Sequence, residues 1–79
     1  MVTKIIYTNH AVKRIPDQGL EKWQVKKTLN KPDLIRPSTA PGCKNYVRVN
    51  NHLEIGATVK KTDDGNWLVI SAWKRELTK

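Results

Sequence analysis

Two side chains that could move a proton and hold a phosphate lie one helical turn apart near the start of the chain. His10 and Arg14 are four residues apart within the segment Thr8–Ile15, so on a helix they share one face. A helix N-terminus and a neighbouring guanidinium both disfavour imidazolium, so we expect His10 to be neutral near pH 7. A neutral imidazole beside a fixed cation suits proton removal next to a phosphate. The same residues also fit a solvated helix start that carries no chemistry.

Caps and helix breakers predict two short helices in the first half of the chain. The first should cover about Asn9–Ile15. Thr8 or Asn9 can cap its free amides, and Pro16 should end it. The second should cover about Leu20–Asn30, with an apolar side toward the core and lysines toward water. Trp23 falls off that apolar line, and periodicity leaves open whether it flanks the core or lies exposed.

The rest of the chain alternates with the two-residue period of β-strands. Thr3–Tyr7 is a short strand or an extended lead-in, and four later segments have the strand pattern: Leu34–Arg36, Lys44–Asn50, His52–Lys61 and Trp67–Lys74. Asn50-Asn51 is a two-residue hairpin signal. The loop Pro37–Cys43 is either an ordinary connection or a mobile flap over a site. The sequence therefore predicts a single α+β domain, residues 1–79, with the order β-α-α-β-β-β-β.

Alternation along the strands predicts one aliphatic face and one basic, aromatic face. The aliphatic set, expected to pack on the helices, is Val47, Val49, Leu53, Ile55, Ala57, Val59, Leu68, Ile70 and Ala72. The other set is Lys44, Tyr46, Arg48, His52, Glu54, Thr58, Lys60, Trp67, Val69, Ser71 and Trp73. Cations neutralise phosphates, and aromatic rings stack on unpaired bases with ~1–3 kcal/mol per base. The composition of this face therefore predicts nucleic-acid binding by Lys44, Tyr46, Arg48, Trp67 and Trp73. Alternatively, Trp67, Val69 and Trp73 form a second small core under the loop.

Charge and cysteine content narrow the class of partner and the compartment. The 79 residues carry a net charge of +8, which favours a polyanionic partner: nucleic acid, an anionic membrane surface or an acidic protein. No apolar run approaches the ~18 residues of a membrane span, and Met1–Ile6 lacks the features of a secretory signal. The one cysteine, Cys43, cannot form an internal disulfide, which fits a reducing cytosol. Cys43, His10 and His52 lack metal-ligand spacing, so we expect no metal and no cofactor.

Several short motifs occur in an order that matches a known family. They are Tyr7-Thr8-Asn9-His10-Ala11 with Arg14, Gly19-Leu20, Asn30-Lys31-Pro32-Asp33, Lys44-Asn45-Tyr46 and Val69-Ile70-Ser71-Ala72-Trp73-Lys74. From about Thr3 to Lys74 the chain resembles a family of small bacterial domains of unknown function. That family is grouped with the barnase–EndoU–colicin–RelE ribonuclease toxins, which include RelE-, BrnT- and colicin D-like domains. The resemblance implies a RelE-like fold with two N-terminal helices packed on one face of a four-stranded antiparallel sheet.

The resemblance also implies metal-independent RNA cleavage. In that reaction a base removes the ribose 2′-hydroxyl proton, and the oxygen attacks the adjacent phosphate to give a 2′,3′-cyclic phosphate. By position, His10 would be the base or acid and Arg14 would hold phosphate charge, while Ser71 would hydrogen-bond the phosphate and Lys74 would stabilise developing charge. The residues implied to contact RNA are Lys44, Tyr46, Arg48 and Trp73.

Two classes of function follow from these patterns. The first is an RNA-binding, toxin-like domain that is also an endoribonuclease. The second is a non-enzymatic basic module that binds nucleic acid or an acidic partner protein. A related possibility is a toxin silenced by an acidic antitoxin that covers the open face of the sheet. In each case we expect a cytoplasmic protein that is monomeric in isolation.

Overall fold

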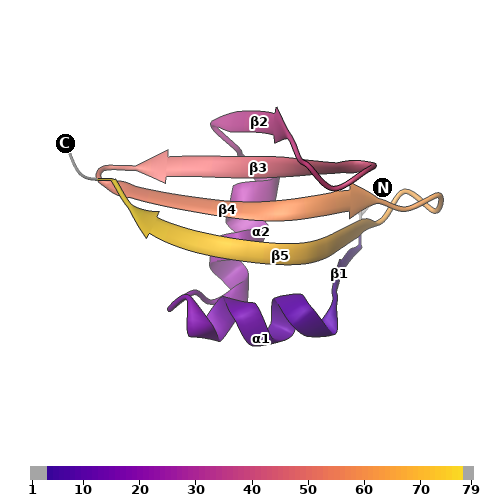
Figure 1. Cartoon of the computed structure of the whole chain (residues 1–79), viewed down its shortest axis with the longest axis horizontal. Coiled ribbons are helices and arrows are strands. Elements are labelled where there is room, and N and C mark those ends of the chain that lie inside the picture. The colour runs from indigo at the N-terminus through magenta and orange to yellow at the C-terminus, as the bar shows by residue number, and fades with distance from the viewer. Residues whose placement is uncertain (1–3, 78–79) are drawn as a thin grey trace.

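A five-stranded mixed sheet with two helices on one side forms the framework of the molecule (Figure 1). The computed structural model describes residues 4–77. Its elements are β1 (Ile5–Tyr7), α1 (Asn9–Asp17), α2 (Lys22–Asn30), β2 (Leu34–Pro37), β3 (Cys43–Asn50), β4 (Leu53–Lys61) and β5 (Trp67–Glu76). The strand order across the sheet is β1-β5-β4-β3-β2. The predicted α+β class and element order are confirmed.

The expected four-stranded antiparallel sheet is wrong, because the first strand also joins the sheet. β1 adds a fifth strand, paired parallel to β5 with Ile5 opposite Trp67 and Tyr7 opposite Val69. Thr8 prolongs this pairing, because its amide donates to the Val69 carbonyl at 3.1 Å and its hydroxyl donates to the Ile70 carbonyl at 3.1 Å. The chain thus enters α1 directly from the edge of β5, and α1 then packs along that strand (Figure 1).

Both helices begin at capping residues. The Thr8 hydroxyl accepts from the Ala11 amide at 3.1 Å at the start of α1. At α2, Glu21 and Gln24 form a capping box, so the helix starts at Lys22 and not at the predicted residue 20. The predicted stop at Pro16 is also wrong. Proline removes only its own N–H, and α1 continues to Asp17.

Each helix buries one narrow stripe against the sheet. Ala11 and Ile15 are the buried residues of α1, and Val25, Thr28 and Leu29 are those of α2. The apolar members of both stripes join Tyr46, Ala57, Val59, Val69 and Ala72 of the strands in one core. Trp23 lies outside this core with 58% of its surface exposed, which decides the question that periodicity had left open.

The strand register reverses half of the predicted face assignment. The β3–β4 turn is Asn51-His52, with Asn51 at φ 57°, one residue later than predicted. A two-residue turn pairs residue numbers with an odd sum, as in Tyr46 with Ala57, so even-numbered β3 residues share a face with odd-numbered β4 residues. We had instead expected the odd-numbered residues of β3 and the odd-numbered residues of β4 to share one face.

A β-bulge in β5 changes the alternation a second time. The pairing passes from Val59–Val69 to Thr58–Ser71, so Ile70 is an extra residue. On the helix side lie Lys44, Tyr46, Arg48, Ile55, Ala57, Val59, Trp67, Val69, Ala72 and Lys74. On the outer side lie Val47, Val49, Glu54, Gly56, Thr58, Lys60, Leu68, Ser71 and Trp73. Lys44, Tyr46, Arg48, Trp67 and Val69 therefore face the helices, against expectation, and Val47, Val49 and Leu68 face away. The alternative second core is wrong, because Trp67 and Val69 lie on the opposite side from Trp73.

The outer side has its own small buried cluster. The Trp73 indole lies directly on Gly56, where an added Cβ would be 2.1 Å from Cζ2 of the ring. Its N–H donates to Glu54 at 2.9 Å, and Arg75 approaches the same carboxylate at 3.0 Å. Val47, opposite Gly56 in the ladder, is fully buried. Trp73 therefore packs against the sheet and is held in place by Glu54.

Candidate nucleic-acid interface

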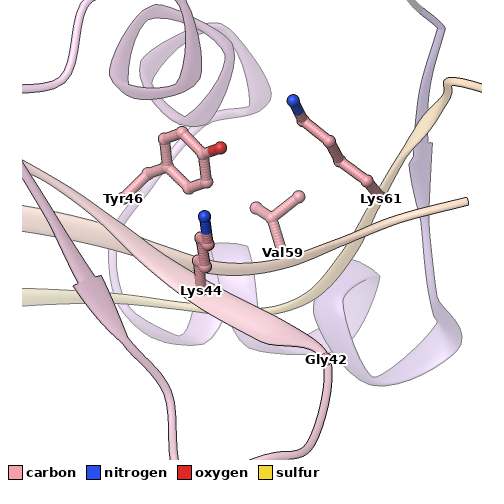
Figure 2. Close-up of a pocket in the computed structure, with 5 residues that line it drawn as sticks. All are labelled: Gly42, Lys44, Tyr46, Val59 and Lys61. Carbon is pink, nitrogen blue, oxygen red and sulfur yellow. The ribbon is translucent and has the colours of Figure 1, made fainter.

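A basic pocket opens on the helix side of the sheet where β3 begins and β4 ends. Figure 2 shows its lining residues, with the Lys44 and Lys61 ammonium groups and the Tyr46 hydroxyl on the same side of the sheet. The lining consists of Gly42, Lys44, Tyr46, Val59 and Lys61. We call this site the lysine–tyrosine pocket.

Strand alternation and the β3–β4 register place these side chains together. Lys44 and Tyr46 are two residues apart on β3, and Val59 and Lys61 are two apart on β4, so each pair points to one face. The ladder sets Lys44 opposite Val59. Val59 is buried and forms an apolar floor, whereas both lysines are exposed. The pocket therefore has an apolar floor, and the two lysine ammonium groups lie around it.

The Tyr46 ring lines the pocket, and the Trp67 ring adjoins it. The Tyr46 and Trp67 ring centroids are 5.1 Å apart with planes tilted by 38°. Lys61 Nζ lies 5.8 Å from the Trp67 ring centroid, which is within the range of a cation–π contact. Lys22 Nζ, on α2, lies 5.3 Å from the ring centroid of Tyr7, which is on β1. Burial raises the pKa of Tyr7, so this ring stays a neutral surface.

The electrostatics of the pocket favour an anion. Two ammonium groups and one hydroxyl are its side-chain donors, and no aspartate or glutamate is among the lining residues. Such donors form short, charge-assisted hydrogen bonds to phosphate oxygens. Nearby rings add stacking surface for a base. The arrangement can therefore bind a phosphate with an adjoining planar group.

Three of the five predicted nucleic-acid-binding residues come together here: Lys44, Tyr46 and Trp67. Arg48 is on the same face but lines a different pocket beside Trp23, and its guanidinium donates to the Lys31 carbonyl at 3.4 Å. Trp73 is on the opposite side of the sheet. The expected single groove containing both Tyr46 and Trp73 is therefore wrong.

The four predicted catalytic residues do not share one face. His10 and Arg14 are exposed on α1, and neither lines the lysine–tyrosine pocket. Ser71 pairs with Thr58 on the outer side. Lys74 is on the helix side, where its ammonium donates to the Gly19 carbonyl at 3.4 Å in the α1–α2 loop. The catalytic roles of these residues stay predictions.

Lys61 is the charged pocket residue that the sequence did not predict, and the contact of Lys22 with Tyr7 is a second feature that it did not predict. The alternation assigned Lys60 to the basic face in place of its neighbour. Applying the odd-sum rule of the predicted hairpin would have put Lys61 with Lys44 and Tyr46. Lys22 of α2 and Tyr7 of β1 meet only in the folded chain, and no spacing in the sequence marks that contact.

No family model matches the chain, and no curated protein and no solved structure is similar enough to match it. Among residues 4–77, neither helix has the length and apolar character needed to cross a membrane. The geometry of the pocket is therefore the observation that points to a function.

Proposed function

We propose that this domain binds single-stranded RNA through the lysine–tyrosine pocket and the adjoining Trp67 ring. The observation that carries the proposal is the convergence of Lys44, Lys61 and the Tyr46 hydroxyl beside the Tyr46–Trp67 ring pair. The cations suit backbone phosphate and the rings suit an unpaired base. A net charge of +8 adds long-range attraction for a polyanion.

The resemblance to ribonuclease toxins makes RNA the nucleic acid to choose. The α+β class and two N-terminal helices agree with a RelE-like fold, to which β1 would be an added edge strand. On this proposal the protein acts in the bacterial cytoplasm, and an acidic antitoxin is a partner to look for. Cleavage has no comparable support, because His10 does not line the pocket.

The test is RNA affinity as a function of salt for the wild type and for Lys44→Ala and Lys61→Ala. Each lysine that contacts a phosphate should contribute about 0.7 to the log–log salt slope for a single strand, so each variant should bind more weakly and with a shallower slope. Lys26→Ala is the matched control, because Lys26 is exposed on α2 and does not line the pocket. Unchanged affinity and slope in both pocket variants would refute the proposal.

A further inference from the structure

We propose that the lysine–tyrosine pocket recognises a terminal phosphate monoester, the phosphorylated end of an RNA strand, in preference to an internal phosphodiester. This inference rests on the proposed function and specifies which part of the RNA enters the pocket. It follows from three properties of the pocket: the number of its donors, its uncompensated charge and its apolar floor.

The donors match the oxygens of a monoester in number. Lys44 Nζ, Lys61 Nζ and the Tyr46 hydroxyl are the three side-chain donor groups in the lining, and Figure 2 shows them directed into one space. A terminal phosphate has three oxygens without a second ester bond, whereas an internal phosphodiester has two. A monoester can therefore offer each of the three donors its own anionic oxygen, whereas an internal diester has to share two oxygens among them.

The charges match as well. Two ammonium groups share the pocket, and its lining contains no carboxylate to compensate them. A phosphate monoester carries about −1.5 to −2 at neutral pH, whereas a diester carries a single negative charge. A single monoester can therefore neutralise both lysines, whereas a single diester neutralises only one of them.

The surroundings also favour a strand end. Val59, which is 3% exposed, closes the pocket below, and the sheet backbone lies beneath it. A strand that ends in the pocket does not need a second exit. The base next to the terminal phosphate can then lie against Trp67, whose ring contacts Tyr46. The phosphate would be read by the lysines and the base only by stacking.

The experiment is competition against a labelled RNA at constant salt. The competitors are a short RNA with hydroxyl groups at both ends, the same RNA with a phosphate at its 5′ or its 3′ end, and an RNA one nucleotide longer with hydroxyl ends. The longer RNA adds backbone charge without a terminal phosphate. Inorganic phosphate serves as a further competitor, to separate a strand end from the free anion.

We expect at least one end-phosphorylated RNA to compete about tenfold better than the longer hydroxyl-ended RNA, which is the effect of one charge-assisted hydrogen bond. Whichever end gives the advantage identifies the end that is bound. Lys44→Ala and Lys61→Ala should abolish the preference, and Tyr46→Phe should reduce it while keeping the buried ring. Lys26→Ala should retain it.

Equal competition by the longer hydroxyl-ended RNA and both phosphorylated RNAs would overturn the inference, as would a preference that survives in both lysine variants. Inorganic phosphate that competes as well as the phosphorylated RNA would also overturn it, since a strand end would then add nothing. Failure of the proposed function would differ from these results: no RNA would bind, or binding would not depend on Lys44 and Lys61.

Discussion

Glu54 is a buried carboxylate on the side of the sheet that has no helix. It is 6% exposed and accepts from the Trp73 indole N–H at 2.9 Å. Arg75 lies 3.0 Å from its carboxylate and Arg36 lies 3.9 Å away. The Trp73 hydrogen bond lowers the pKa of Glu54, burial opposes that change, and the two guanidinium groups lower the pKa further. The ionised carboxylate therefore holds Trp73 over Gly56.

The lowered pKa predicts a pH-dependent contribution of Glu54 to stability. The contribution is fully present above the unfolded-state value, near 4.5, and is lost as the pH falls through the lower folded-state value. We expect Glu54→Gln to lower the free energy of unfolding by about 1–2 kcal/mol at neutral pH. The difference from wild type should shrink below pH 4.5.

Urea denaturation across that pH range measures this difference. Glu76→Gln is the control, because Glu76 is an exposed carboxylate at the end of the same sheet. Curves for wild type and Glu54→Gln that stay a constant distance apart down to low pH would show that the carboxylate does not stabilise the folded state through its charge.

β5 is the element on which the predicted and observed arrangements differ most. Val69 is fully buried against the helices, and its neighbour Leu68 points to the outer side opposite Lys60. The sequence pattern had assigned these two residues the other way round. The bulge at Ile70 then restores the expected orientation for Ala72 and Trp73. A single extra residue therefore divides β5 into a segment with reversed faces and a segment with expected faces.

Substitution of these neighbours tests the face assignment directly. Val69→Asp places an unpaired carboxylate in the core and should cost at least about 3 kcal/mol, enough to unfold much of a small domain. Leu68→Asp should cost about 1 kcal/mol or less, because water reaches that side of the strand. Thermal melts of both variants give the comparison. A stable Val69→Asp variant and an unfolded Leu68→Asp variant would support the original assignment.

At the scale of the whole molecule, the pocket and the predicted catalytic histidine belong to different parts of the fold. The pocket lies where β3 begins and β4 ends, whereas α1 packs on β5 and exposes His10 to solvent. General acid–base catalysis needs the imidazole within hydrogen-bond reach of the proton that it transfers. Because His10 does not line the lysine–tyrosine pocket, we do not expect it to reach the 2′-hydroxyl proton of an RNA held there.

We accordingly expect the full chain to bind RNA without cutting it. Gel analysis of RNA incubated with wild type or with His10→Ala should show intact RNA in both cases. The two proteins should also bind the same fraction of the RNA. RNA fragments with 2′,3′-cyclic phosphate ends, made by the wild type but not by His10→Ala, would contradict this expectation and support the ribonuclease prediction.

The sequence by itself determined the elements and the chemistry available to them. Thr8 predicted the start of α1, and the two-residue alternation located the later strands within a residue or two. The basic, aromatic composition predicted nucleic-acid binding by Lys44, Tyr46 and Trp67, and this role stays a prediction, although Lys44 and Tyr46 line one pocket and Trp67 adjoins it. These features depend on neighbours along the chain, so local propensity and periodicity carry them.

Only the tertiary structure decided which side of the sheet each residue faces. That outcome depends on the hairpin register at Asn51, on the bulge at Ile70 and on the parallel pairing of β1 with β5, and each of these joins residues that are not adjacent in sequence. Because strand side chains alternate strictly, one residue of register exchanges the two faces. That exchange brings Lys44 and Tyr46 to the same face as Lys61 and leaves Trp73 on the opposite side.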